Sequence, residues 1–221
     1  MKLLISGLVK FLCGFLLVGL LIFLPAGSFT FTNGWLFIGL LFVPVLTLGI
    51  VLFIKAPHLL EARLNGKEKE ATQKGVVALS GLIFIGGFIV AGLDFRFGWS
   101  NMPTAVTVVA SVLFLISYGL YAEVMRENAY LSRTIHVQKN QKVVDTGLYA
   151  VVRHPMYAVT VVLFLAIPLI LGSWWAFLIF LPYPAIIAVR IINEEKVLSA
   201  QLEGYEEYKK KVKYRLVPFL W

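Results

Sequence analysis

The sequence predicts an all-α integral membrane protein with about six transmembrane helices, the last two forming a tight hairpin, followed by a C-terminal cytoplasmic amphipathic helix. The first observation is composition: 59% of the 221 residues are hydrophobic and the mean hydropathy is +0.84. Charged residues make up only 14%, whereas a typical soluble domain has about 25%. The other two observations are the lengths of the apolar runs and the positions of the basic residues.

The apolar runs have the length of membrane spans, since a helix needs roughly 20 apolar residues to cross a bilayer. We expect the first run to be a retained span rather than a cleaved signal peptide, because no small-x-small cleavage site follows it. The six runs are residues 1–24, 34–54, 75–93, 104–122, 155–171 and 174–190.

Two of the early runs carry further expectations. The third run is rich in glycine, and Gly81 with Gly86 or Gly87 favours close approach of a neighbouring helix. The single cysteine, Cys13, lies within the first run, where we expect a small core residue. One cysteine excludes an intramolecular disulfide and a cysteine-based metal site, and we expect no metal centre.

The last two runs are joined only by Gly172 and Ser173, which predicts a helical hairpin over residues 155–190. Each arm has about 17 residues and is about 25 Å long, near the lower limit for crossing a bilayer. Proline interrupts the hydrogen bonding of a helix. We therefore expect kinks at Pro168, Pro182 and Pro184.

The basic residues lie on one side of the predicted spans. Of the 20 lysines and arginines, only Arg96 lies outside the N-terminal segment, residues 55–74, residues 126–153 and the chain from Arg190 onward. By the positive-inside rule this multi-pass protein has both termini in the cytoplasm. The net charge of +8 then reflects orientation among membrane lipids. A nucleic-acid partner is excluded, because the lysine and arginine residues do not gather on one face of a soluble domain.

Chemistry-bearing residues are concentrated in the C-terminal part of the chain. We interpret residues 1–122 as a four-span scaffold and residues 123–221 as a catalytic region. Polar residues precede the hairpin at 147–157 and follow it at 190–195, so the hairpin would return them to one membrane surface. Arg190 and Glu194 would share one helix face, with Glu195 pointing elsewhere. The sequence does not decide whether Arg153 and Glu195 anchor the protein at the membrane surface or bind a ligand.

The tail after the hairpin shows helical spacing of apolar residues opposite a charged face. We expect a helix that packs back onto the cytoplasmic surface, with Lys209, Lys210 and Lys211 at lipid headgroups. The sequence leaves the oligomeric state open. The spaced apolar residues are Leu198, Leu202, Tyr205, Tyr208, Val212 and Leu216.

The polar residues also form an ordered series of motifs. Gly-x-Tyr is followed by Arg-His-Pro-x-Tyr, an apolar hairpin, Arg-x-x-x-Glu-Glu, Gly-Tyr-x-x-Tyr and a closing proline. Over about the last 90 residues this series resembles the isoprenylcysteine carboxyl methyltransferase and phospholipid methyltransferase group of membrane enzymes. The resemblance implies an integral membrane methyltransferase that uses S-adenosyl-L-methionine as its cofactor and methyl donor.

The resemblance also implies roles for individual residues. Arg190 matches the arginine assigned to the acceptor, and Arg190 and Glu194 would be the catalytic residues. The loop before the hairpin, the Arg-His-Pro-x-Tyr turn and the carboxylate after the hairpin would hold the donor. The implied donor contacts are Gln138, Gln141, Lys142, Val143, Val144, Tyr149, His154, Pro155, Met156, Tyr157 and Glu194.

The acceptor would be a lipophilic small molecule or a lipid. A guanidinium suits a carboxylate better than an amine, so Arg190 favours the carboxylate of an isoprenylcysteine-like or other lipophilic acid. Methylation of a phospholipid amine is one alternative, with Arg190 on the phosphate. Another is an NADPH-dependent membrane reductase of the sterol reductase type, which has a similar His-Pro-x-Tyr region. A non-enzymatic transporter or assembly protein is the third.

Overall fold

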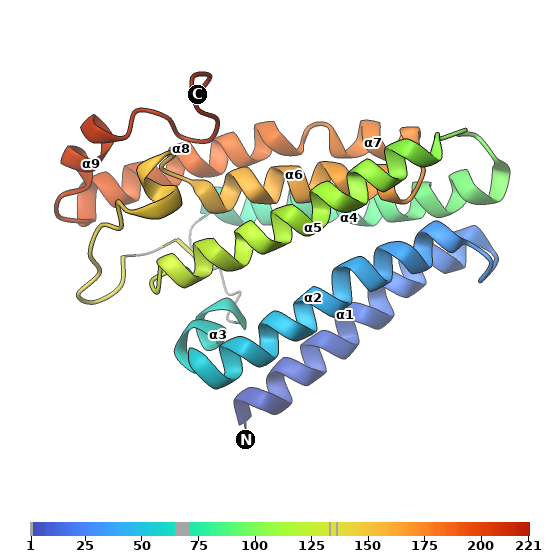
Figure 1. Ribbon diagram of the computed structural model, residues 1–221, viewed down its shortest axis with the longest axis horizontal. Helices are drawn as coiled ribbons and strands as arrows, with labels where there is room; N and C mark the ends of the chain where they lie inside the picture. The colour runs from blue at the N-terminus through green and yellow to red at the C-terminus, as the bar shows by residue number, and fades with distance from the viewer. Residues whose placement is uncertain (1, 65–70, 133, 136) are drawn as a thin grey trace.

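The regular structure of this chain is helical throughout the part described by the computed structural model, which covers residues 2–64, 71–132, 134–135 and 137–221. This confirms the all-α prediction. Lys67, Lys69 and Arg133, three of the basic residues placed on the cytoplasmic side, lie outside the described residues. In chain order the elements are α1 (Lys2–Ala26), α2 (Thr32–Lys55), α3 (Pro57–Leu64), α4 (Ala71–Phe97), α5 (Thr104–Glu127), the 3₁₀ turn η1 (Gly147–Ala150), α6 (Pro155–Ile170), α7 (Trp174–Phe180), α8 (Tyr183–Gln201) and α9 (Tyr205–Lys211) (Figure 1).

The apolar runs correspond to long helices. Five helical segments of the described chain are long and apolar enough to cross a membrane, and the sixth run forms the shorter apolar helix α6. The helices extend beyond several predicted ends because polar residues at a membrane boundary can continue a helix into water. The five longer segments are Lys2–Ala26, Thr32–Lys55, Gln73–Phe97, Thr104–Glu127 and Trp174–Gln201.

The hairpin is fixed at its turn by a buried carboxylate. Gly172 adopts a positive φ of 79°, and the Ser173 hydroxyl caps α7 by accepting from the Ala176 N–H at 3.0 Å. Asp94 of α4 accepts hydrogen bonds from the Ser173 hydroxyl and, at 2.7 Å, from the Ser100 N–H. The turn is therefore tied to the end of α4, far along the bundle from α9 (Figure 1).

The second arm of the hairpin is interrupted as its prolines predict. Helix α7 ends at Phe180 and α8 begins at Tyr183, with Pro182 at the break. Pro184 lies in the first turn of α8, where the missing N–H has no helical partner to lose. Pro168, in contrast, lies inside α6 close to its end.

Close helix approach occurs at one of the three glycines named for it. A Cβ atom on Gly87 of α4 would lie 2.2 Å from the Phe180 ring of α7, while Gly81 has no neighbour within 4 Å of such an atom. Phe180 in turn packs edge-on against Phe84, with ring centroids 5.3 Å apart. Gly87 thus allows the α4–α7 contact at the centre of the core.

Two expectations are wrong. Cys13 is exposed on α1 and not in the core. The tail is not one continuous helix, because Gly204 (φ 80°) separates α8 from α9 and α9 ends at Lys211. The apolar tail residues still cluster as predicted, with Leu202, Tyr205, Tyr208 and Val212 packing together and against Val137, Val143 and Leu198.

Candidate functional site

A cavity of about 630 Å³ opens between the bundle and the segment that precedes the hairpin. This volume falls in the usual range of small-molecule sites. One part of its wall is apolar and comes from the spans α2, α4, α5, α6 and α8. The other part is polar and comes from α3, residues 128–132, 134–135 and 141–144, Tyr149, the start of α6 and the end of α8. Its apolar wall includes Leu41, Val45, Val76, Phe84, Phe114, Leu163, Phe164 and Ile187.

Most of the residues assigned by resemblance line this cavity. Two do not: Pro155, which begins α6, and Gln138. The Gln138 side chain donates to the Tyr130 carbonyl at 2.6 Å, and its backbone N–H donates to the Gln141 side chain at 2.8 Å. Gln138 therefore holds the loop in shape. The lining residues are Gln141, Lys142, Val143, Val144, Tyr149, His154, Met156, Tyr157, Arg190 and Glu194.

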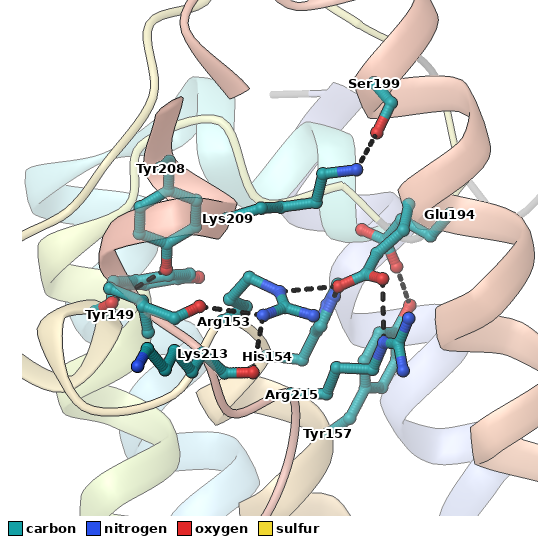
Figure 2. Close-up of polar contacts among 12 residues, drawn as sticks. Tyr149, Arg153, His154, Tyr157, Glu194, Ser199, Tyr208, Lys209, Lys213 and Arg215 are labelled. Atoms are coloured by element: carbon teal, nitrogen blue, oxygen red, sulfur yellow. Dashed lines mark hydrogen bonds and ion pairs between the residues drawn. The ribbon is translucent and has the colours of Figure 1, made fainter. Parts of the chain in front are cut away.

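Tyr157 joins the two catalytic candidates. Its hydroxyl donates to Glu194 Oε2 at 2.6 Å (Figure 2). The same hydroxyl accepts from Arg190 Nε at 2.8 Å. The Arg190 guanidinium carbon also lies 5.8 Å from the centre of the Tyr157 ring. Arg190 and Glu194 thus share one face of α8, as their four-residue spacing predicts. The first hairpin arm supplies the group that connects them.

Glu195 faces a different set of partners. It accepts from Arg153 Nε at 2.7 Å and Arg215 Nε at 2.8 Å, with His154 Nε2 at 3.3 Å. The side chains of Glu195, Arg153 and His154 are all buried. Arg153 and Glu195 therefore form a buried ion pair, and Arg153 also lines the cavity.

The same ion pair connects the hairpin to the C-terminal tail. Arg153 Nη1 donates to the carbonyls of Val212 and Lys213 at 2.7 and 2.8 Å. The Arg153 and His154 N–H groups donate to the carbonyls of Tyr214 and Arg215, both at 2.9 Å. The tail is therefore bound to the Arg-His-Pro-x-Tyr turn through side chains and backbone together.

Tyr149 is held by hydrogen bonds from two other segments of the chain. Its hydroxyl accepts from the Asn128 side chain at 3.0 Å, and its carbonyl accepts from the Tyr208 hydroxyl at 2.7 Å. Burial raises the pKa of both phenols, so they stay protonated. Next to Tyr149 in the chain, the Leu148 N–H donates to the Glu127 carboxylate at 3.0 Å.

A substitution at Gly147, the first residue of η1, tests how strongly the position of Tyr149 depends on the conformation of this turn. Gly147 has a positive φ of 53°, and a Cβ atom there would overlap Glu127 Oε1. We expect Gly147→Ala to destabilise the protein by about 1–3 kcal/mol and to weaken ligand binding at Tyr149. Detergent-induced unfolding measures the loss. Gly119→Ala on α5, with no neighbour within 4 Å of its Cβ, is the control, and equal stability of both variants would contradict the prediction.

Two polar residues that contact groups at the cavity come from helices α3 and α4, outside the motifs. Arg63 of α3 lines the cavity, donates to the Tyr121 hydroxyl and lies 5.6 Å from the Tyr121 ring centre. Gln73 of α4 accepts from Arg190 Nη1 at 2.8 Å. Both come from the predicted scaffold, so their contacts depend on how α3 and α4 pack against the hairpin.

Comparison with known proteins gives one result for this region. Residues 104–203 match the family model of phospholipid methyltransferases. The matched segment begins with α5 and ends shortly after α8, so it includes the hairpin and both polar clusters. No curated protein matches the chain. The match confirms the family resemblance found in the motifs.

Proposed function

We propose, from the match of residues 104–203 to the phospholipid methyltransferase family model, that the protein transfers a methyl group from S-adenosyl-L-methionine to a membrane-embedded acceptor. The contact carrying this proposal is the Tyr157 hydroxyl between Arg190 and Glu194, at 2.8 and 2.6 Å. It unites the two polar clusters at the wall of a cavity that also has an apolar part.

The residues at the polar part of the cavity fit this donor. When bound, it supplies a methyl group on a sulfonium sulfur, which an acceptor atom displaces in line. Glu194 would accept hydrogen bonds from its hydroxyl or amino groups, and Lys142 and His154 would meet its carboxylate. The Tyr149 and Tyr157 rings would lie against its cationic centre.

The acceptor follows from Arg190 and its apolar surroundings. Arg190 would bind and orient a carboxylate, and the apolar wall would hold the chain of a lipophilic acid. The family match favours a second candidate, a phospholipid whose phosphate takes the place of the carboxylate and whose amine is methylated. Because basic residues gather at this end of the spans, we infer that it faces the cytoplasm, as both termini would.

Separate titrations of the purified protein with S-adenosyl-L-methionine and NADPH test the reaction class. We expect binding of the methyl donor and methylation of a component of membrane lipid extracts when the donor is labelled. Labelled lipid acids and labelled phospholipid amines distinguish the two acceptor classes. Binding of NADPH alone would replace this proposal with a reductase of the sterol reductase type.

Glu194→Ala is expected to weaken donor binding by about 10-fold, because a charge-assisted hydrogen bond is lost. Calorimetric titration with S-adenosyl-L-methionine measures the change. The control is Glu206→Ala, which removes a half-exposed carboxylate paired with Lys209 on α9. A donor affinity equal to wild type in Glu194→Ala would remove Glu194 from the donor site.

A further inference from the structure

Gln73 is a fully buried polar residue in the first turn of an apolar span. Its side chain is 0% exposed, and its Oε1 accepts a hydrogen bond from Arg190 Nη1 at 2.8 Å. Burying an amide is unfavourable unless it finds a hydrogen-bonding partner. The two residues are 117 positions apart in the sequence, and Gln73 lies outside the family-matched segment 104–203. It links the N-terminal scaffold directly to the acceptor arginine.

Among the described residues, Tyr157 and Gln73 bind two different nitrogens of the Arg190 guanidinium. Nε of the guanidinium is bound to the Tyr157 hydroxyl of α6, and Nη1 is bound to the Gln73 side chain of α4. Because a guanidinium is planar, hydrogen bonds at two of its nitrogens fix both its plane and its direction. A neutral amide does this without adding a negative charge beside the acceptor's anionic group.

We propose that Gln73 is a positioning residue that aims Arg190 at the anionic group of the acceptor. This inference rests on the proposed function, in which Arg190 binds that group. Gln73 is not among the described residues that line the cavity, so it acts through Arg190 and does not touch either substrate. The scaffold therefore contributes to acceptor recognition and does more than hold the catalytic region in the membrane.

Three Gln73 variants test this role. Gln73→Leu removes the hydrogen-bond acceptor and is expected to lower kcat/KM for the acceptor lipid about 10-fold with donor affinity unchanged. Gln73→Asn keeps the amide but is one methylene shorter, so we expect a loss in the same direction. Gln73→Glu keeps an acceptor atom at full length, so kcat recovers while the added charge raises KM for the anionic acceptor.

A double-mutant cycle with Arg190 separates positioning from general stability. In an Arg190→Ala background, Gln73→Leu is expected to cause no further loss of residual turnover, because the group it positions is gone. Ser111→Ala on α5, whose hydroxyl donates to the Thr107 carbonyl of its own helix, is the control for removing a polar group from a span.

The outcomes are distinguishable. Equal acceptor kcat/KM in wild type and Gln73→Leu would overturn the inference while leaving the proposed function intact. So would a loss that reappears in full in the Arg190→Ala background, or one that lowers donor affinity to the same extent. A wild-type protein that binds no S-adenosyl-L-methionine would overturn the proposed function itself.

Discussion

Replacing Arg190 with alanine is expected to reduce methyl transfer about 100-fold while donor affinity stays at the wild-type level. Arg190 is 9% exposed and is oriented by Tyr157 and Gln73. Removing one member of a buried charged pair typically costs about 3 kcal/mol, which corresponds to that factor. The donor would contact Glu194 instead, so its binding free energy should not change.

Two measurements on the same preparation separate these effects. Calorimetry gives the affinity for S-adenosyl-L-methionine, and labelled donor with lipid extract gives the turnover. Arg126→Ala serves as the charge control, because the Arg126 side chain is 73% exposed and pairs with Glu123 on α5. Normal turnover by Arg190→Ala would mean that another group binds the acceptor.

Much of this site follows from local sequence spacing. Residues four apart on a helix share a face, and that rule alone is enough to place Arg190 beside Glu194. The two-residue link at Gly172 and Ser173 likewise predicts the hairpin that returns α8 to the start of α6. Spacing cannot show that Tyr157 bridges the pair, because that contact depends on the rotation of α6 against α8.

The features that spacing misses are contacts between distant segments. In the sequence Gln73 is one of several polar residues at the end of the loop 55–74, and its contact with Arg190 depends on α4 packing against α8. The tail residues keep a helical period, yet Gly204 adopts the left-handed conformation and separates α8 from α9. Charge alone predicts Lys211 at lipid headgroups, whereas its side chain donates to Asp145 at 2.7 Å.

Glu195→Ala is expected to lower the free energy of unfolding by roughly 3–5 kcal/mol, the usual result of removing one member of a buried ion pair. Glu195 is 6% exposed and is shared by Arg153, Arg215 and His154. Without it the Arg153 charge stays buried, and the carbonyls of Val212 and Lys213 are its remaining acceptors among the described residues. Unfolding by sodium dodecyl sulfate in mixed micelles measures the change.

The exposure of the residues around Glu195 predicts how the loss of stability should differ between variants. The Arg215 side chain is 35% exposed, so Arg215→Ala should cost only about 1 kcal/mol. Glu206→Ala, which breaks an exposed pair with Lys209, should leave stability almost unchanged. Equal losses in all three variants would mean that Glu195 is not the central anion of this cluster. Tail cleavage by protease should rise mainly in Glu195→Ala, because Arg153 and His154 connect the tail to the hairpin at the wall of the cavity.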